Sequence, residues 1–376
     1  MANRKGKRKT RSGSDRRHRQ TLEKDRYFKE INIARGIGVL IVLLGHSFPD
    51  AELGVFPHFG YRWVYDFCYA FHMALFFVIS GFVMGRKFFD GGHGFRREAL
   101  RKIKRLLIPY LFLSYASLLP KILWNAYARN PVDEESVWRV LLGRSPNGSL
   151  WYLYTLFVFS LYALLIASIL RRAGDGVKIV CVILPAVVLY AVGYSLGEEF
   201  LQHIYLERIF RYFLYYSLGI IIYAFYGRVK AFLHPIPGGM ALLAVGGLAC
   251  PLVGRESPYL VTALSGTYGI LALALYLSGK KGKLRVFFDL CGERSYDIYI
   301  FSYYIQQSVR VLLYREAGWE YPVVLLLELF GGFGLSLLLS LLIRRSKLLK
   351  ALFTGEWSGE RRYTGKKEEE TDVCGQ

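Results

Sequence analysis

Long apolar segments recur along almost the whole chain, and they constrain its fold more strongly than any other feature of the sequence. A helix needs about 20 mainly apolar residues to cross a bilayer, and the segments approach this length. They lie near residues 31–48, 67–85, 106–124, 149–169, 177–195, 208–226, 238–253, 259–278, 295–314 and 321–343. Backbone polar groups must be satisfied inside lipid, so the pattern predicts an all-α, polytopic membrane protein of about ten transmembrane helices.

The composition supports this fold class and argues against a nucleic-acid-binding protein. Of 376 residues, 53% are hydrophobic and 16% are aromatic. The formal net charge of +20 could indicate a nucleic-acid partner, but the basic residues fall in short groups between apolar segments. No nucleic-acid partner is therefore expected. The five cysteines are scattered and show neither metal-ligand spacing nor a disulfide framework.

The distribution of basic residues predicts the orientation in the membrane. Cytoplasmic loops are enriched in Lys and Arg. Here 38 of the 49 Lys and Arg residues lie in one alternating set of segments, which comprises both tails and the loops at 86–105, 171–178, 228–230 and 280–294. The opposite loops carry acidic clusters. Both termini are therefore predicted to be cytoplasmic, which requires an even number of spans.

Three regions are expected along the chain. Residues 1–30 form a basic cytoplasmic tail, residues 31–343 a transmembrane domain and residues 344–376 a cytoplasmic C-terminal tail, with both tails polar and disordered. The first apolar segment follows the basic tail as a signal peptide would, but residues 45–48 do not form a convincing small-residue cleavage site. This segment is therefore interpreted as a retained first helix.

The first apolar segment contains two ionisable residues, Arg35 and His46, which are eleven positions apart. In a helix this spacing returns to within about 20° of the same face, with a rise of about 16 Å. Such groups are costly inside a membrane and usually face a partner, a cavity or a substrate. The pair suits a long ligand that places an anionic head at Arg35 and a reactive end at His46. Alternatively, Arg35 extends to the inner surface and His46 bonds a neighbouring helix.

The second segment places His72 at a depth comparable with His46, so the two histidines could share a proton-transfer site. His72 could orient His46 or stabilise a developing oxyanion. Farther along, Ser80 and Gly81 are interpreted as a small-residue packing face, in preference to a nucleophilic role for Ser80.

Basic residues directly precede the third segment, at Arg101, Lys102, Lys104 and Arg105. They could be topology anchors that contact anionic lipid. The competing interpretation is a phosphate-binding cluster for a cytosolic donor. Pro109 is expected in the first turn of the helix, where a missing N–H is tolerated.

Near the predicted outer surface, Glu207, Arg208 and Arg211 open the sixth segment. They could pair with one another or line a polar acceptor site. Trp151 and the many tyrosines near span ends are interpreted mainly as an aromatic belt, although aromatic faces also stack on sugar rings. The residues alone leave these alternatives open.

Taken together, the segments resemble acyltransferase family 3, the multi-spanning bacterial acyltransferases that modify surface polysaccharides and other glycans. Arg35 and His46 match the basic-x10-His signature of that family. Further matches are the second-helix segments at 71–73 and 76–81, the basic stretch at 101–105 with Pro109 and Tyr110, and the segments at 150–153 and 295–299. The likeness covers about residues 31–343 and is closest to the branch related to fucose O-acetylases.

The resemblance implies an O-acyltransferase of the bacterial plasma membrane, with acetyl-coenzyme A as cytosolic co-substrate and a carbohydrate or glycan hydroxyl as acceptor. No permanently bound cofactor and no metal are expected. The expected catalytic residues are His46, Arg35 and His72. The expected donor-binding residues are Arg35, Arg101, Lys104 and Arg105, and the expected acceptor-binding residues are Trp151, Arg208, Arg211 and Tyr299.

The sequence departs from the family pattern at three positions. Asn32 stands where an acidic residue is expected, and Ala74 replaces a usual proline. Ser302 stands where many relatives have a histidine, which leaves the details of acceptor binding open.

The rival class is a transporter or flippase for a glycan or lipid precursor, with the histidines as proton relays. This class explains the number of spans equally well. It does not explain the basic cluster that accompanies Arg35 and His46, and the sequence lacks the paired short, broken helices typical of transporter repeats. Dependence on acetyl-coenzyme A rather than on a proton gradient separates the two classes.

Overall fold

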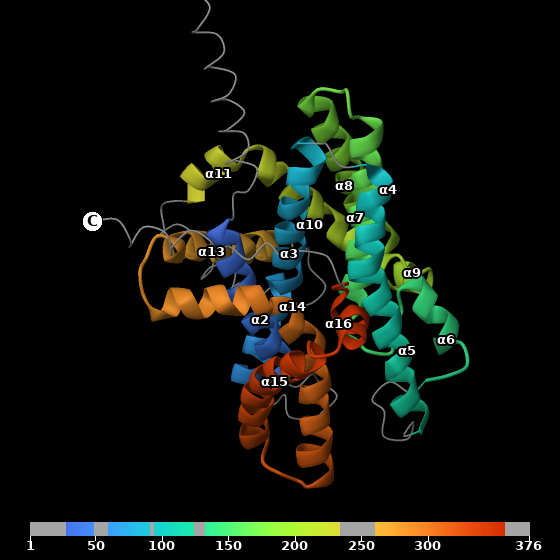
Figure 1. The fold of residues 1–376 in the computed structure, drawn as a ribbon, viewed down its shortest axis with the longest axis vertical. Coiled ribbons are helices and arrows are strands. Elements are labelled where there is room, and N and C mark those ends of the chain that lie inside the picture. The colour runs from blue at the N-terminus through green and yellow to red at the C-terminus, as the bar shows by residue number, and fades with distance from the viewer. Residues whose placement is uncertain (1–27, 49–58, 91–93, 124–131, 234–259, 358–376) are drawn as a thin grey trace, which may run out of the picture. The chain divides into compact units, whose positions relative to one another are not determined.

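The computed structural model describes residues 28–48, 59–90, 94–123, 132–233 and 260–357, which form helices joined by turns and loops (Figure 1). The main helices are α2 (Lys29–Ser47), α3 (Phe59–Asp90), α4 (Phe95–Lys102), α5 (Ile108–Leu123), α6 (Ser136–Arg139), α7 (Trp151–Ile169), α8 (Asp175–Leu196), α9 (Glu198–His203), α10 (Glu207–Ala224), α11 (Tyr226–Leu233), α13 (Leu260–Ser278), α14 (Lys283–Val309), α15 (Tyr321–Ile343) and α16 (Lys347–Thr354). Shorter elements are the π-helices η2 (Ile103–Leu107) and η5 (Arg310–Glu316) and the 3-10 turn η4 (Val140–Leu142). No strand occurs among the described residues, which confirms the predicted all-α class.

Seven of the described helices are long and apolar enough to cross a membrane, or eight if α10 and α11, bent by 99°, form one span. The seven cover Lys29–Ser47, Gly60–Asp90, Phe95–Leu123, Trp151–Ile169, Asp175–Leu196, Leu260–Ser278 and Tyr321–Ile343. The predicted span at 238–253 lies outside the described residues. The predicted span at 295–314 falls in α14 and η5, and α14 begins well before it, at Lys283. The count of ten and the cytoplasmic position of both termini stay predictions.

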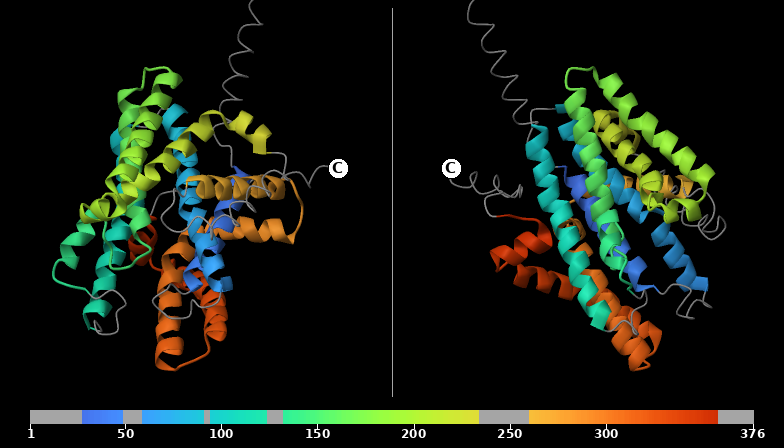
Figure 2. Two further views of the ribbon diagram at one scale, coloured as in Figure 1. Left: turned by 180° about the vertical axis from the view of Figure 1, so that it is seen from behind. Right: turned by 90° about the vertical axis from the view of Figure 1, so that its right-hand side faces the viewer.

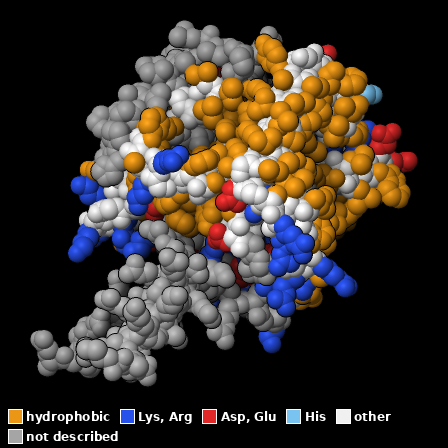
Figure 3. Space-filling model, turned by 90° about the horizontal axis from the view of Figure 1, so that it is seen from above, with side chains coloured by type: hydrophobic (Ala, Val, Ile, Leu, Met, Phe, Trp, Pro, Cys, Tyr) orange, Lys and Arg blue, Asp and Glu red, His pale blue; other side chains and the backbone are white. Residues whose placement is uncertain are grey.

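Exposed aliphatic side chains along α8 are typical of a lipid-facing helix. Only 11% of the most apolar stretch of this helix is buried. Val180, Leu184 and Val188 are among its exposed side chains. On the face drawn in Figure 3, hydrophobic side chains form a broad area, with Lys and Arg beside it. An apolar surface of this extent is favourable against lipid and unfavourable against water.

Two helices at the centre of the unit, α3 and α10, cross at a pair of glycines (Figures 1 and 2). A Cβ atom added to Gly81 would lie 1.9 Å from the carbonyl oxygen of Tyr216, and one added to Gly219 would lie 2.1 Å from that of Val78. The two backbones are therefore in direct contact, as small residues permit. This geometry supports the packing interpretation of Gly81, and the neighbouring Ser80 hydroxyl instead bonds Tyr152 at 2.8 Å.

A second close crossing joins α2 to α14 and explains one departure from the family pattern. A Cβ atom at Gly36 would lie 2.0 Å from the carbonyl oxygen of Phe288. One turn earlier, the Asn32 amide donates to the backbone carbonyl of Asp289 at 2.8 Å and to its carboxylate at 2.7 Å. An acidic residue at position 32 would repel this carboxylate, so an amide suits the contact better.

Pro109 lies inside a longer helical stretch, because α4, η2 and α5 follow one another without a break. Pro109 is the second residue of α5, so the predicted place in a first turn holds for α5 but not for the longer stretch, because helical residues precede it. Proline has no N–H to donate to the preceding turn, so a carbonyl of that turn needs another donor. The Tyr296 hydroxyl of α14 donates to the Arg105 carbonyl of this turn at 3.4 Å. The preceding turn is a π-helix, a form that widens a helix locally.

The same solution occurs in α8, which contains Pro185. The carbonyl that loses its partner is that of Cys181, and the Tyr162 hydroxyl of α7 donates to it at 2.8 Å. A tyrosine from another helix thus satisfies the backbone in both places, as the interior of a membrane requires.

The start of the predicted C-terminal tail is ordered, contrary to the expectation of disorder from residue 344. Helix α16 contacts α5 and α15, and Glu356 pairs with Arg344 at 2.9 Å and with Lys350 at 3.1 Å. Although burial disfavours the charged form, the carboxylates of Asp297 and Glu356 raise the pKa of Arg344 above its ordinary value. These ion pairs tie the segment to the end of α15.

Candidate functional site

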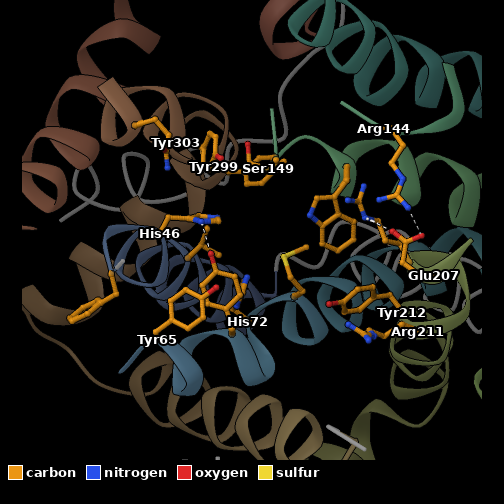
Figure 4. Close-up of a pocket in the computed structure, with 18 of the residues that line it drawn as sticks. His46, Tyr65, His72, Arg144, Ser149, Glu207, Arg211, Tyr212, Tyr299 and Tyr303 are labelled. Atoms are coloured by element: carbon orange, nitrogen blue, oxygen red, sulfur yellow. Dashed lines mark hydrogen bonds and ion pairs between the residues drawn. The ribbon is translucent and has the colours of Figure 1, made fainter. Parts of the chain in front are cut away.

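A cavity of about 480 Å³ collects most of the polar side chains singled out in the sequence. Its walls come from the end of α2, the first half of α3, the segment before α7, the region from α9 to the start of α10, and the α14 to η5 region. The predicted residues that line it are His46, His72, Trp151, Arg208, Arg211 and Tyr299. Figure 4 shows two groups facing each other across the cavity, with His46, His72 and Tyr303 in one and Arg144, Glu207 and Arg211 in the other.

The first group, here called the histidine side, comprises His46, Tyr69, His72 and Tyr303. The Tyr69 hydroxyl lies 2.9 Å from Nδ1 of His46. The His46 ring is 6.4 Å from the His72 ring and 5.3 Å from the Tyr303 ring, measured between centroids. The predicted proximity of the two histidines is therefore present, and a tyrosine hydroxyl holds the His46 ring.

The hydrogen bonding of His72 determines which of its ring nitrogens carries a proton. Nδ1 of His72 lies 2.6 Å from the carbonyl oxygen of Cys68. A carbonyl can only accept, so Nδ1 must donate, and the neutral ring presents Nε2 as an acceptor. The side chain is only 3% exposed. Neutral His72 can therefore receive a hydrogen bond from a hydroxyl, but it cannot donate one to an oxyanion through Nε2.

The second group, here called the arginine side, comprises Arg144, Glu198, Glu207, Arg208 and Arg211. Glu207 accepts from Arg144 at 3.0 Å and pairs with Arg208 at 3.2 Å. Arg211 pairs with Glu198 at 2.6 Å. Three guanidinium groups thus share two carboxylates, and this side of the cavity is rich in hydrogen-bond donors.

Trp151 is held between groups of the protein. The Arg208 guanidinium lies 4.9 Å from the centre of its ring, and the Tyr212 ring is 5.2 Å away. Such a cation–π contact orients Arg208 toward the cavity. Trp151 is therefore part of the cavity wall, and its role in acceptor binding stays a prediction.

Four predicted donor-binding residues lie outside the walls of this cavity: Arg35, Arg101, Lys104 and Arg105. Arg101 pairs with Glu98 at 2.5 Å, and Lys87 of α3 contacts the same carboxylate. Lys87 follows His72 by fifteen positions, about 22 Å along a helix. The basic group therefore lies toward the opposite end of α3 from the histidine side.

Arg35 lies between these two ends. It is half-buried on α2 and interacts electrostatically with Tyr152 of α7. The Tyr152 ring lies 5.8 Å from that of Tyr299, which lines the cavity and donates to the Ser149 carbonyl. Two tyrosines thus connect the surroundings of Arg35 with the cavity.

Several lining residues were not expected from the sequence: Tyr69, Arg144, Tyr303 and Arg310. Arg310 had a usable signal, because it is an ionisable residue in a predicted span. The tyrosines had none, since the chain contains 28 of them. Among the described residues, no group of three or more His, Cys, Asp or Glu side chains could hold a metal ion.

These features define a class: a helical membrane protein whose polar cavity brings two histidines and a cluster of arginines together between its helices. The comparison with known families agrees and is more specific. The model of an acyltransferase domain matches residues 28–345, and the chain belongs to acyltransferase family 3. No curated protein and no solved structure matches the chain. The protein is therefore a membrane acyltransferase, as the resemblance predicted.

Proposed function

We propose that the protein transfers an acyl group, with acetyl expected, from cytosolic acyl-coenzyme A to a hydroxyl group of a carbohydrate or glycan. The observation that carries the proposal is the shared cavity of His46, His72 and the predicted acceptor-binding residues. The basic cluster near the other end of α3 supports a separate site for an anionic donor. In this proposal ten spans cross the bacterial plasma membrane, both termini are cytoplasmic and the cavity faces the outer side.

The donor enters at the basic end. Its phosphates bind near Arg101, Lys104 and Arg105, since guanidinium and ammonium groups bind phosphate oxygens well. Arg35 supports the extended pantetheine arm about 16 Å below His46 along α2. The thioester then lies at the histidine side of the cavity, while the acceptor enters from the other direction and contacts Trp151.

The chemical step needs one proton transfer in each direction. His46 removes the proton of the acceptor hydroxyl, and the oxygen attacks the thioester carbonyl. The C–S bond breaks, and the thiolate of coenzyme A takes the proton from His46. Tyr69 holds Nδ1 of His46, and Nε2 of His72 accepts a hydrogen bond from the acceptor. A covalent acyl-histidine on His46, which the acceptor then attacks, is the alternative route.

Turnover of radiolabelled acetyl-coenzyme A by purified protein in nanodiscs tests the proposal. We expect His46→Ala to abolish hydrolysis and transfer while insertion and abundance stay normal. His203→Ala is the matched control, because His203 is exposed on α9 and does not line the cavity. Normal turnover by His46→Ala would refute the role of His46.

The donor site is tested separately. Arg35→Ala should raise the KM for acetyl-coenzyme A more than it lowers kcat, because the residue is placed on the donor and not on the reacting atoms. Unchanged donor affinity would remove Arg35 from this site. Folded wild-type protein that neither binds nor turns over the donor would favour the transporter or flippase class.

A further inference from the structure

The C-terminal end of α2, which carries His46, is held by side chains from distant helices. The last carbonyl groups of a helix have no partner within it. Two of these carbonyls have donors here: Arg310 donates to the His46 carbonyl at 2.7 Å, and the Tyr321 hydroxyl to the Ser47 carbonyl at 2.5 Å. Gln306 adds bonds to the Leu43 carbonyl at 2.8 Å, which also accepts from the Ser47 hydroxyl, and to that hydroxyl at 2.6 Å. All three donors come from the hairpin of α14, η5 and α15.

The central donor of this set, Arg310, is itself locked in place. Its Nε and Nη2 atoms donate to the two carboxylate oxygens of Glu328 at 2.9 Å and 2.6 Å. Nη2 also makes the bond to the His46 carbonyl. The Arg310 side chain is 7% exposed and that of Glu328 is fully buried. The guanidinium is therefore fixed in a single orientation on the wall of the cavity.

A buried ion pair such as that of Arg310 and Glu328 contributes little to stability by itself. Removing two charges from water costs several kcal/mol per ion, and apolar residues of similar size often stabilise a protein as well or better. A planar guanidinium nevertheless has a property that apolar groups lack. It can donate two hydrogen bonds to one carboxylate and a further hydrogen bond to another acceptor. Arg310 also begins the π-helix η5, a form frequently found at functional sites.

We propose that Arg310, oriented by Glu328, is a positioning residue that fixes the height and direction of His46 in the cavity. Gln306 and Tyr321 support the same helix end. This inference rests on the proposed catalytic role of His46. The bonds from Arg310, Gln306 and Tyr321 to the end of α2 are here called the clamp. Because the donor phosphates bind far from this helix end, loss of the clamp lowers kcat and leaves the KM for acetyl-coenzyme A unchanged.

The test is the double variant Arg310→Met with Glu328→Leu, which removes both charges and leaves neither unpaired. We expect kcat for acetyl-coenzyme A turnover to fall about 10- to 100-fold, since a displacement of about 1 Å can cost two orders of magnitude. The KM should change less than about twofold. Arg310→Lys keeps the charge but cannot reproduce the three contacts of the guanidinium, so its kcat should also fall.

A finer comparison uses two tyrosines with the same chemistry. Tyr321→Phe removes the hydroxyl bound to the Ser47 carbonyl, and Tyr162→Phe removes one bound to the Cys181 carbonyl away from the cavity. Both lose one hydrogen bond to a helix carbonyl. We expect only Tyr321→Phe to lower kcat, while both lower the melting temperature by a similar amount.

Wild-type kcat in the folded double variant would overturn the inference, and so would equal losses of kcat in the two tyrosine variants. Hydrogen exchange of the amides at 43–47 provides a readout that needs no turnover, and it should accelerate in the double variant. Unchanged exchange would overturn the clamp. If wild-type turnover proves independent of His46, the proposed function fails, and exchange still decides whether Arg310 holds this helix end.

Discussion

Replacing Gly81 by alanine tests the contact between the two helices that carry opposite sides of the cavity. Helix α3 carries His72, and α10 carries Arg211. The added Cβ atom would lie 1.9 Å from the Tyr216 carbonyl oxygen, whereas ordinary contacts begin at 3.4 Å. The obstacle is backbone, which cannot rotate away, so the helices must separate locally by about 1.5 Å.

The size of the effect follows from two opposing contributions. Overpacking of this kind costs about 1–3 kcal/mol, and an unyielding backbone atom places Gly81→Ala near the upper value. Alanine in place of glycine within a helix contributes about 0.5–1 kcal/mol in the favourable direction. The net loss of unfolding free energy is therefore about 2 kcal/mol, which corresponds to a melting temperature about 5 °C lower.

Gly334→Ala supplies the control, because nothing lies within 4 Å of a Cβ atom at that position of α15. Melting temperatures of both variants are measured in the same detergent, together with acetyl-coenzyme A turnover at a temperature where both are folded. We expect Gly334→Ala to match or exceed the wild type in stability. Gly81→Ala should be less stable and less active, since the cavity walls move apart.

Equal melting temperatures for the two variants would refute the reasoning, because they would mean that α3 and α10 are not in backbone contact at Gly81. A stable Gly81→Ala protein with normal turnover would in addition show that the geometry of the cavity does not depend on this helix crossing.

Two further predictions concern single hydrogen bonds. Tyr69→Phe removes the hydroxyl 2.9 Å from Nδ1 of His46; the loss of about 1 kcal/mol should lower kcat about fivefold, and steady-state kinetics that show no change would refute a role in orienting His46. Asn32→Asp replaces the amide that donates to Asp289 by a second carboxylate and should lower the melting temperature at neutral pH by several degrees. The double variant Asn32→Asp with Asp289→Asn should recover part of this loss, because it restores the side-chain bond but not the bond to the backbone carbonyl. A failure to recover any of it would contradict the pairing.

The helices could be predicted from the sequence because apolar length alone identifies a membrane-crossing helix. The residues at which the helices begin and end could not be predicted in this way. Helix α14 begins at Lys283, because its polar first turns pack against α2 at Gly36 and bond Asn32. The start of the third span was misplaced for a related reason, because the chain is helical from Phe95 to Leu123. Pro109 indicates a helix start only if the preceding turn has no other donor, and the donor to the Arg105 carbonyl, Tyr296, is 191 positions from Arg105 in the chain.

The candidate site was predictable where a charge or ring stands out in an apolar surrounding. His46 was found in this way and Arg208 from the polar group that opens the sixth segment, and the structure places both on one cavity. Arg144 was not found, because a charged residue in a loop is unremarkable until the fold brings it to Glu207. The ion pair of Arg310 and Glu328 was missed because its members lie on either side of a turn, and sequence spacing does not reveal such a pairing.

The clamp on α2 also has a consequence for biosynthesis. The bonds that hold the end of this helix join residues 259 to 274 positions apart. Helix α2 is therefore synthesised long before the hairpin that fixes its end, and a nascent chain that stops between His46 and Glu328 carries His46 without its full set of partners. If His46 acts as proposed, its alignment waits for this hairpin, so a translation product interrupted before it is expected to be inactive.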